Sequence, residues 1–318
     1  MALISVVVPF FNEEGNVAEM LRRTAEVLER ATLARGDEYE IVAVNDGSRD
    51  RTLETLRAVQ REQPRLVVVD LSRNFGHQIA ATAGMETARG DAVILMDGDL
   101  QDPPELIERF LDKWREGYDV VYATRRARRG ESGFKLLTAR LFYRLIRRMT
   151  NVEIPVDTGD FRLMSRRVVD ALGQTRERHR FLRGLVSWVG FKQTGIEYDR
   201  DARYSGRTKY PLSKMLRFAF DGITSFSEIP LRFATYTGFV VSAFAFVYTA
   251  IVIALKFMGL NEPGYTSMMV AILFLGGVQL IGIGILGEYV GRIYDQIKGR
   301  PLYLVSSVER VAGVPISK

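Results

Sequence analysis

Short runs rich in Val and Ile alternate with longer amphipathic segments in the N-terminal part of the chain. Runs of this kind predict strands, whereas apolar positions three and four residues apart predict helices. The predicted strands are Leu3–Pro9, Tyr39–Val44, Leu66–Leu71, Ala92–Met96 and Asp119–Ala123, and the predicted helices are Asn16–Ala34, Arg51–Glu62, Gln78–Thr87 and Pro104–Arg115. This alternation predicts an α/β domain whose mostly parallel sheet is covered by helices on both faces.

Two later segments, Phe233–Leu255 and Thr266–Gly287, contain no charged residue. As helices each would be about 33 Å long, enough to cross the hydrocarbon core of a bilayer. Two buried helices of a soluble core are the alternative, but such cores rarely contain uncharged runs of this length. The joining segment, Lys256–Tyr265, contains Gly and Pro, so the pattern predicts a transmembrane helical hairpin (233–287) with both outer ends on one side. The second span has small residues that allow close helix packing, although glycine is common in membrane helices: Gly276, Gly277, Gly282, Gly284 and Gly287.

Basic residues gather outside the hairpin rather than in its loop. The outer flanks contain Lys209, Lys214, Arg217, Arg232, Arg292, Lys298 and Arg300, whereas the loop contains Lys256 offset by Glu262. The positive-inside rule therefore places the domain 1–211 and the tail 288–318 in the cytoplasm, with the hairpin in the inner (plasma) membrane. The segment 212–232 is predicted to be amphipathic and to contact lipid headgroups. Lys135–Met149, with four arginines on one helical face, predicts either a helix on anionic lipid or a surface helix packed on the core.

The amino-acid composition excludes several kinds of metal site and catalytic group. The 318 residues include no cysteine, which excludes disulfides, thiolate zinc sites, iron–sulfur clusters and a thiol nucleophile. The only histidines are His77 and His179, so a histidine-rich metal site is not expected, and we interpret both as structural or surface residues. The N-terminus has no basic segment before its apolar run, which predicts a strand rather than a signal peptide. A net charge of +6 indicates anionic partners: phosphate ligands, an acidic membrane surface or nucleic acid.

Polar residues follow three of the predicted strands. Asp97-Gly98-Asp99 comes directly after Ala92–Met96, and ligands of open α/β sheets bind beyond the carboxyl ends of the strands. Paired carboxylates suit Mg²⁺ or Mn²⁺, which can bridge a diphosphate, and Gly98 would let the backbone approach the ligand. In the turn after Tyr39–Val44, Asp46 could accept hydrogen bonds from a base or ribose, and Asp50 is expected to cap the next helix. The glycine pattern of a nicotinamide dinucleotide site is absent after the first strand, which disfavours a dehydrogenase.

Several separated motifs together give the chain a family resemblance. They are Val8-Pro9-Phe10-Phe11-Asn12-Glu13-Glu14, Asn45-Asp46-Gly47-Ser48, Ser72-Arg73-Asn74-Phe75-Gly76, Asp97-Gly98-Asp99-Leu100-Gln101-Asp102-Pro103-Pro104, Thr158-Gly159-Asp160-Phe161-Arg162-Leu163 and Arg300-Pro301-Leu302-Tyr303. In this order they resemble glycosyltransferase family 2, which has the GT-A fold. With the two spans, the resemblance is to polyprenyl-phosphate glycosyltransferases, most of all bactoprenol glucosyltransferases and more distantly dolichol-phosphate mannose synthases.

The resemblance implies roles for individual residues. Pro9, Phe11, Glu13 and Asp46 match positions that hold the nucleotide, together with Asp97 and Gly98; Phe11 replaces a frequent Tyr, which preserves stacking but not a hydroxyl hydrogen bond. Asp97, Asp99 and Gln101 match the metal and diphosphate group, and Arg125, Arg203 and Lys209 match phosphate-binding positions. Asp160 matches a proposed catalytic base. A phosphate monoester is already mostly dianionic at neutral pH, so we favour an orienting role for Asp160 over base action. The basic run Arg125–Gly130 is interpreted as a phosphate-binding loop, with a solvated loop as the alternative.

The implied reaction is an inverting, metal-dependent transfer of a hexose, glucose from UDP-glucose, to undecaprenyl or another polyprenyl phosphate. GDP-mannose, UDP-GlcNAc and UDP-galactose remain alternative donors, and relatives suggest a homotetramer. A processive polysaccharide synthase is disfavoured because neither Trp114 nor Trp188 lies in a Gln-x-x-Arg-Trp motif. A transporter is disfavoured because a single hairpin forms no pathway, and nucleic-acid binding because the basic residues gather beside the spans. A non-catalytic, membrane-anchored nucleotide-binding protein remains the alternative of a different class.

Overall fold

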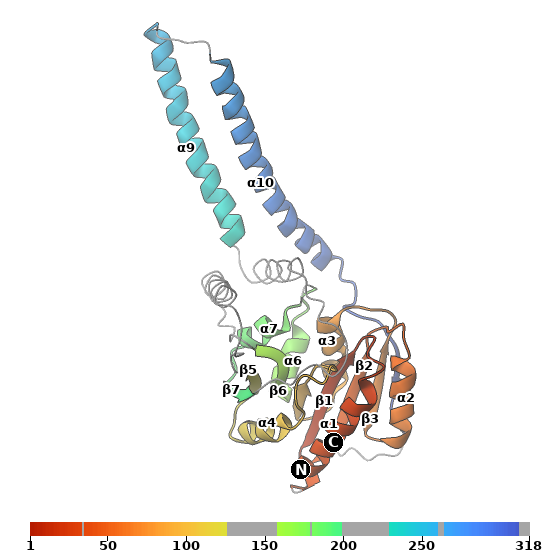
Figure 1. Ribbon diagram of the computed structural model, residues 1–318. Helices are drawn as coiled ribbons and strands as arrows, with labels where there is room; N and C mark the ends of the chain where they lie inside the picture. Colours follow the sequence, from red (N-terminus) through yellow and green to blue (C-terminus); the bar gives the residue numbers. More distant parts are fainter. Residues whose placement is uncertain (34, 126–157, 179, 199–228, 260–263, 312–318) are drawn as a thin grey trace, which may run out of the picture. The chain divides into compact units, whose positions relative to one another are not determined.

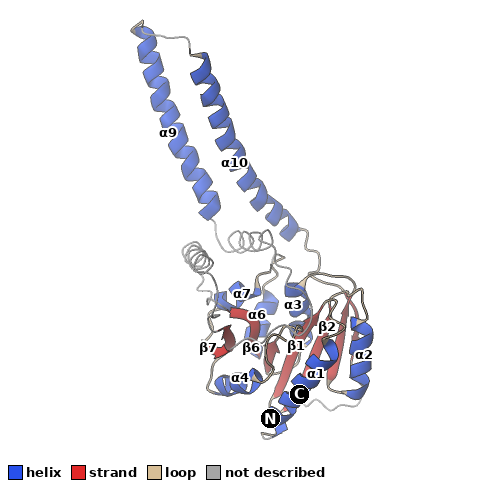
Figure 2. Ribbon diagram, in the orientation of Figure 1, coloured by secondary structure: helices blue, strands red, loops and turns tan. Residues whose placement is uncertain are grey.

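A computed structural model describes the chain except residues 34, 126–157, 179, 199–228, 260–263 and 312–318. The described residues form two units, one with most of residues 1–215 and with 300–318, the other with most of 216–299. The first unit is a sheet between helices (Figure 2). Its strands are β1 (Leu3–Phe10), β2 (Glu38–Asn45), β3 (Leu66–Leu71), β4 (Ala92–Leu95), β5 (Val120–Arg125), β6 (Thr158–Ser165), β7 (Gln193–Tyr198) and β8 (Val305–Glu309). Its helices are α1 (Val17–Leu33), α2 (Thr52–Glu62), α3 (His77–Thr87), α4 (Leu106–Arg115), α6 (Arg166–Gln174) and α7 (Leu182–Trp188).

The eight strands form one sheet in the order β7-β5-β6-β4-β1-β2-β3-β8. Strands β4, β1, β2 and β3 run parallel, as the alternation of strands and helices predicts. Strand β6 lies antiparallel between β4 and β5, so it begins at the edge of the sheet where β4 ends. The fold class is therefore confirmed as α/β with a mostly parallel sheet.

Alternate residues of β1 face opposite helical layers because successive side chains of a strand point to opposite faces. Ile4, Val6 and Val8 belong to the core cluster that contains Met20 of α1 and Phe110 of α4. On that face α1 packs against α2 and α4. On the other face α3 packs against β1 and β2, and also contacts α6 (Figure 1). All eight residues of β1 are buried, which is why its sequence is apolar at every position except Ser5 rather than alternating.

The segment predicted as the tail contains a strand that the sequence pattern did not predict. Residues Val305–Glu309 form β8, which pairs antiparallel with β3 at the edge of the sheet of the first unit. Arg57 of α2 binds Glu309 with a shortest distance of 2.6 Å. Arg310 binds Glu40, a fully buried carboxylate of β2, at 3.0 Å. The chain therefore returns to the first unit after the hairpin and completes its sheet.

The second unit contains two long helices, α9 (Ile229–Phe257) and α10 (Tyr265–Ile297), which contact each other. Each has a window of mean hydropathy 2.3 of which 0% is buried. A core helix of a soluble protein would instead be mostly buried. The two helices include both predicted spans, and α10 continues ten residues beyond Gly287 into the part of the chain predicted as tail.

Candidate functional site

The sheet register brings two predicted aspartates together. Leu95 of β4 pairs with Arg162 of β6, and the strands are antiparallel. Two residues beyond Leu95 is Asp97, and two residues before Arg162 is Asp160, so both carboxylates lie at the carboxyl end of β4. This is the edge at which open α/β sheets bind their ligands. Residues far apart in the sequence are thus adjacent because of strand pairing.

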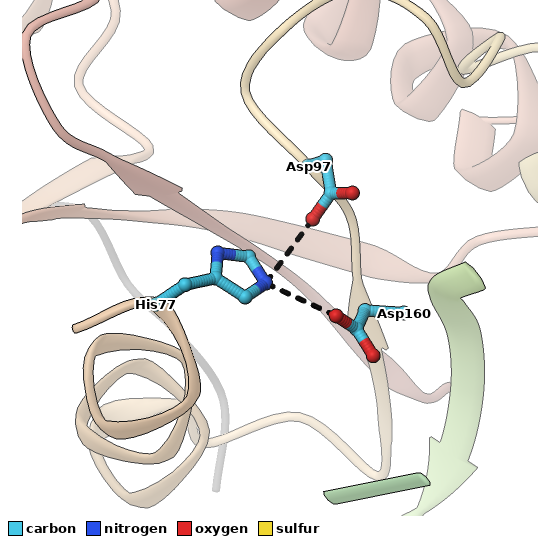
Figure 3. Close-up of side chains that lie close together, drawn as sticks. All are labelled: His77, Asp97 and Asp160. Carbon is cyan, nitrogen blue, oxygen red and sulfur yellow. Dashed lines mark ion pairs between the residues drawn. The ribbon is translucent and has the colours of Figure 1, made fainter. Parts of the chain in front are cut away.

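His77, the first residue of α3, lies between these carboxylates (Figure 3). Its Nε2 is 3.2 Å from Asp97 Oδ1 and 3.3 Å from Asp160 Oδ2. Burial disfavours the imidazolium, but the hydrogen bond to Asp160 and the charges of both aspartates outweigh it and raise the pKa of His77 to about 9. The sequence led us to interpret His77 as a structural or surface residue. The structure places it in contact with both carboxylates of the site.

Asp160 is 4% exposed, and both of its oxygens have partners. Arg183 of α7 donates from Nε to Oδ1 at 2.8 Å and from Nη2 to Oδ2 at 3.4 Å. Gln78 Nε2 donates to Oδ2 at 3.1 Å. Burial would raise the pKa of Asp160, but the charge of Arg183 and the hydrogen bonds from His77 and Arg183 hold it well below its ordinary value. Asp160 is therefore an ionised carboxylate enclosed by cations.

Asp97 is in the opposite electrostatic state. Burial and the like charges of Asp160, Asp102 and Asp99 raise the pKa of Asp97 to about 6 against the charge of His77. Its Oδ1 is buried and accepts no hydrogen bond from the described residues, although His77 lies close. A buried carboxylate oxygen crowded by other carboxylates is stabilised by a cation.

The donor groups of this edge fit a divalent cation. His77, Asp97 and Asp160 each have an atom that can bind a metal, His77 only in its neutral form, and these atoms lie within 4.8 Å of one another. Carboxylate oxygens suit Mg²⁺ and Mn²⁺, and the unbonded Asp97 Oδ1 is the atom most in need of such a partner. Of the predicted ligands, Asp97 belongs to this group, whereas the Oδ1 of Asp99 accepts a hydrogen bond from the backbone N–H of Gln101 at 3.2 Å.

The loops after β1 and β2 bind each other. Asn12 receives a hydrogen bond from the Arg49 N–H at 2.8 Å, and its own N–H donates to Ser48 Oγ at 3.1 Å. The N–H of Glu13 donates to Thr52 Oγ1 at 3.0 Å, while Phe11 remains 43% exposed. Pro9 is buried in β1. An exposed aromatic ring on a fixed loop can stack on a base, as predicted for Phe11.

Asp46 is 2% exposed and holds the loop before α3. Its oxygens accept hydrogen bonds from the N–H groups of Phe75 at 2.7 Å and Gly76 at 3.0 Å, and from the Asn74 side chain at 2.9 Å. Burial raises the pKa of Asp46 in spite of these hydrogen bonds. Gly47 has φ +61°, and a Cβ there would lie 2.3 Å from the Arg73 carbonyl carbon. The Asn-Asp-Gly turn therefore positions the loop that presents His77.

The structure adds to the roles predicted for Gly98 and Asp50. A Cβ on Gly98 would lie 2.7 Å from the Phe10 ring, so glycine is also required here by the packing of Phe10. Helix α2 begins at Thr52 with Arg51 at the N-cap position, so Asp50 does not occupy the cap itself. It nevertheless accepts a hydrogen bond from the Thr52 N–H at 3.1 Å and thereby binds the first turn.

Some predicted residues lie outside the described part of the chain. They are Arg203, Lys209, His179, the amphipathic segment Lys135–Met149 and residues 212–228. Arg125 ends β5, and its side chain is not among those described. The structure therefore does not bear on the predicted phosphate-binding residues.

Sequence reasoning missed three residues at this edge: His77, Gln78 and Arg183. A signal for the first two was present, because they follow the third strand as the predicted donors follow the first, second and fourth. Arg183 had no such signal, since only the packing of α7 brings it to Asp160.

The carboxylates and the exposed aromatic ring follow strands at the edge where open α/β sheets bind their ligands. The family model described as glycosyl transferase family 2 matches residues 5–173. The chain belongs to this family and is a glycosyltransferase with a GT-A-like domain.

Similarity extends through the two apolar helices. The model described as GtrB C-terminal hairpin matches residues 229–293. An uncharacterized glycosyltransferase of Synechocystis is 50% identical over 99% of this chain and 98% of its own length. The prophage bactoprenol glucosyl transferase homolog of Escherichia coli is 44% identical, over 96% of this chain and 99% of its own. The bactoprenol glucosyl transferase of Shigella phage SfX is 45% identical, again over 96% and 99%.

Proposed function

We propose that this glycosyltransferase transfers a hexose, glucose from UDP-glucose, to undecaprenyl or a related polyprenyl phosphate, with inversion at the anomeric carbon. The reaction takes place at the cytoplasmic face of the inner membrane and yields a lipid-linked sugar for glycan or O-antigen modification. Relatives named as bactoprenol glucosyl transferases, similar over almost the whole chain, support the acceptor and the sugar. The observation that carries the chemistry is the proximity of Asp97 and Asp160 at the carboxyl end of β4, where their carboxylate oxygens lie within 4.8 Å of each other.

The residues of the chain have separable tasks in this reaction. Phe11 stacks on the donor base, and the linked loops after β1 and β2 fix its position. Asp97, with Asp99 and Gln101 beside it, holds Mg²⁺ or Mn²⁺. When bound, such an ion supplies positive charge that stabilises the departing nucleoside diphosphate. Arg125, Arg203 and Lys209 contribute further positive charge toward phosphates.

Asp160 acts by orientation rather than by removing a proton. A phosphate monoester has a second pKa near 6, so the acceptor is already mostly a dianion at neutral pH. Both oxygens of Asp160 already accept hydrogen bonds. A base needs a lone pair within reach of the proton that it removes, and the donors of Arg183 and Gln78 already occupy this position on Asp160. These contacts support an orienting role for Asp160.

The membrane assignment rests on the two apolar helices and on charge. The outer ends of the hairpin carry more basic residues than its loop, which supports a cytoplasmic catalytic domain. A homotetramer is part of the proposal by resemblance alone.

The donor and the cation are tested together. The full-length chain, purified in detergent, is incubated with undecaprenyl phosphate and radiolabelled UDP-glucose, UDP-galactose, UDP-GlcNAc or GDP-mannose, with Mg²⁺, Mn²⁺ or EDTA. We expect a lipid-soluble labelled product from UDP-glucose that EDTA abolishes. If only another donor gives a product, the sugar of that donor replaces glucose in the proposal. Nucleotide binding without any lipid product would favour the non-catalytic alternative.

A further inference from the structure

Asp160 shares its buried carboxylate with an arginine that reaches the edge of the site. Arg183 binds both oxygens of Asp160, and its side chain is 27% exposed whereas that of Asp160 is 5% exposed. Arg162 is also near Asp160, at 4.0 Å, but it is buried and donates to the Gly159 carbonyl oxygen at 2.9 Å. Of these two arginines, Arg183 is therefore the one that an external ligand can meet.

Gln78 fixes the helix that carries Arg183. Its side-chain oxygen accepts a hydrogen bond from the Leu182 N–H at 2.9 Å, at the start of α7. Its side-chain nitrogen donates to Asp160 at 3.1 Å. One amide group thus joins α3, α7 and Asp160, so the position of Arg183 is determined both through its own ion pair and through its backbone.

The ion pair of Arg183 with Asp160 places it near a different part of the sheet from the predicted donor residues. Phe11 and Asp46 follow β1 and β2, on one side of β4 in the strand order. Asp160 lies near the start of β6, on the other side of β4, and Arg183 binds it there. Asp97 lies at the boundary between these two halves. A group that attacks a donor bound over β1 and β2 approaches from the β6 half.

We propose that Arg183, held by Asp160 and Gln78, binds the phosphate of the lipid acceptor. A guanidinium offers five N–H donors in a planar fork and is suited to phosphate oxygens. Asp160 then acts as a positioning residue whose negative charge is balanced by Arg183 and His77, so that it does not repel the incoming dianion. This inference rests on the proposed acceptor and extends it to residues that the family resemblance did not assign.

The test separates acceptor binding from donor binding. The full-length protein in detergent is titrated by calorimetry with geranyl phosphate, with geraniol as the uncharged control, and separately with UDP in the presence of Mn²⁺. The same samples yield kcat and the KM values for undecaprenyl phosphate and for the donor. The variants are Arg183→Gln and Arg183→Lys. The matched control is Arg115→Gln, because Arg115 is 28% exposed and is paired with the nearly buried Asp37 away from this edge.

We expect Arg183→Gln to weaken geranyl phosphate binding and to raise the acceptor KM by about tenfold or more, as expected for the loss of a charge-assisted hydrogen bond. UDP binding and the donor KM should change less than about twofold. Arg183→Lys should restore part of the loss because it keeps the charge, and Arg115→Gln should leave every binding constant unchanged.

An unchanged acceptor KM in both Arg183 variants would overturn the inference, as would an equal loss of UDP binding. If the wild-type protein forms glycolipid while its Arg183 variants bind geranyl phosphate normally, only this inference fails. The wild-type protein could instead bind UDP without binding prenyl phosphate and without forming a lipid product. In that case both this inference and the proposed function fail.

Discussion

At the scale of single residues, the two aspartates at the end of β4 differ because their neighbours differ. Asp160 is surrounded by the donors of Arg183, Gln78 and His77, which stabilise its charge. Burial and the charges of neighbouring carboxylates disfavour the charge of Asp97, and the charge of His77 only partly offsets them. One carboxylate therefore organises side chains, and the other is suited to hold a metal.

The Asp160→Asn variant tests whether this carboxylate is a base. Its pKa is held well below the ordinary value, so the group is ionised throughout pH 6 to 9 and contributes no titration step there. We expect a loss of about 10²-fold in kcat/KM, the size of effect that follows removal of one preorganised electrostatic group. Because the charge of Asp160 also raises the pKa of His77 and of Asp97, the pH profile of the variant should shift with these two groups, but the loss of rate should persist at pH 9. A variant that regains a near-normal rate at high pH would show that Asp160 serves as a base.

Residues after strands were predictable, and residues that depend on tertiary packing were not. Asp97 and Asp46 follow apolar runs, and a parallel sheet brings its strand ends to one edge. Asp46 was expected to meet a nucleotide, yet in the structure its oxygens hold Phe75 and Gly76. The sequence shows that a carboxylate lies at the carboxyl edge of the sheet, but it does not show which groups donate hydrogen bonds to it.

At the scale of elements, the parallel half of the sheet was predictable because its strands are apolar runs bounded by turns. β6 was not predicted, because Asp160 and Arg162 interrupt its apolar pattern while being buried in the strand. β8 was not predicted either, since Val305–Glu309 is short, polar and separated from β3 by most of the chain. Strands of this kind are specified by their partners rather than by periodicity.

The ion pair between Arg310 and Glu40 makes the end of the chain part of the domain. Glu40 is 0% exposed and also accepts hydrogen bonds from Ser5 Oγ at 2.7 Å and the Arg89 N–H at 2.6 Å. Removing one partner of a buried pair leaves an uncompensated charge, a loss that typically costs about 3–5 kcal/mol. Because Arg310 is partly exposed, we expect Arg310→Gln to lower the free energy of unfolding by about 2 kcal/mol.

The measurement is thermal unfolding of the full-length protein in detergent. Arg22→Gln is the control, since Arg22 forms only exposed ion pairs on α1 and its loss should leave the melting temperature unchanged. Arg310→Gln should melt several degrees lower. Equal melting temperatures for the two variants would mean that Glu40 does not depend on the returning chain.

At the scale of the whole molecule, one chain combines an α/β domain with two helices that are long and apolar enough to cross a membrane. Length, hydropathy and charge distribution were sufficient to predict these helices. Any helix that crosses a bilayer needs about 20 mostly apolar residues, whatever the rest of the sequence is. The return of the chain to the sheet through β8 requires that both outer ends of the hairpin connect to the same domain. Two spans satisfy this requirement when the domain and β8 share one side of the membrane.

Single-cysteine variants test this topology without background, because the chain contains no cysteine. Met258 follows α9 and is 70% exposed, and Glu62 ends α2 in the domain. In intact spheroplasts a membrane-impermeant maleimide should label Met258→Cys at once and Glu62→Cys only after permeabilisation. Labelling of Glu62→Cys in intact spheroplasts would place the domain outside and contradict the proposed orientation.

Mass spectrometry of the lipid product tests whether the edge formed by Asp97 and Asp160 joins a sugar to a polyprenyl phosphate. The wild-type protein, Asp97→Asn and the exposed-surface control Asp112→Asn are each incubated with UDP-glucose, Mn²⁺ and undecaprenyl phosphate. We predict one hexosyl phosphoryl undecaprenol from the wild type and from Asp112→Asn, and at least about 10²-fold less from Asp97→Asn. Undiminished product from Asp97→Asn, or no hexosylated lipid from the wild type with any donor, would contradict the account.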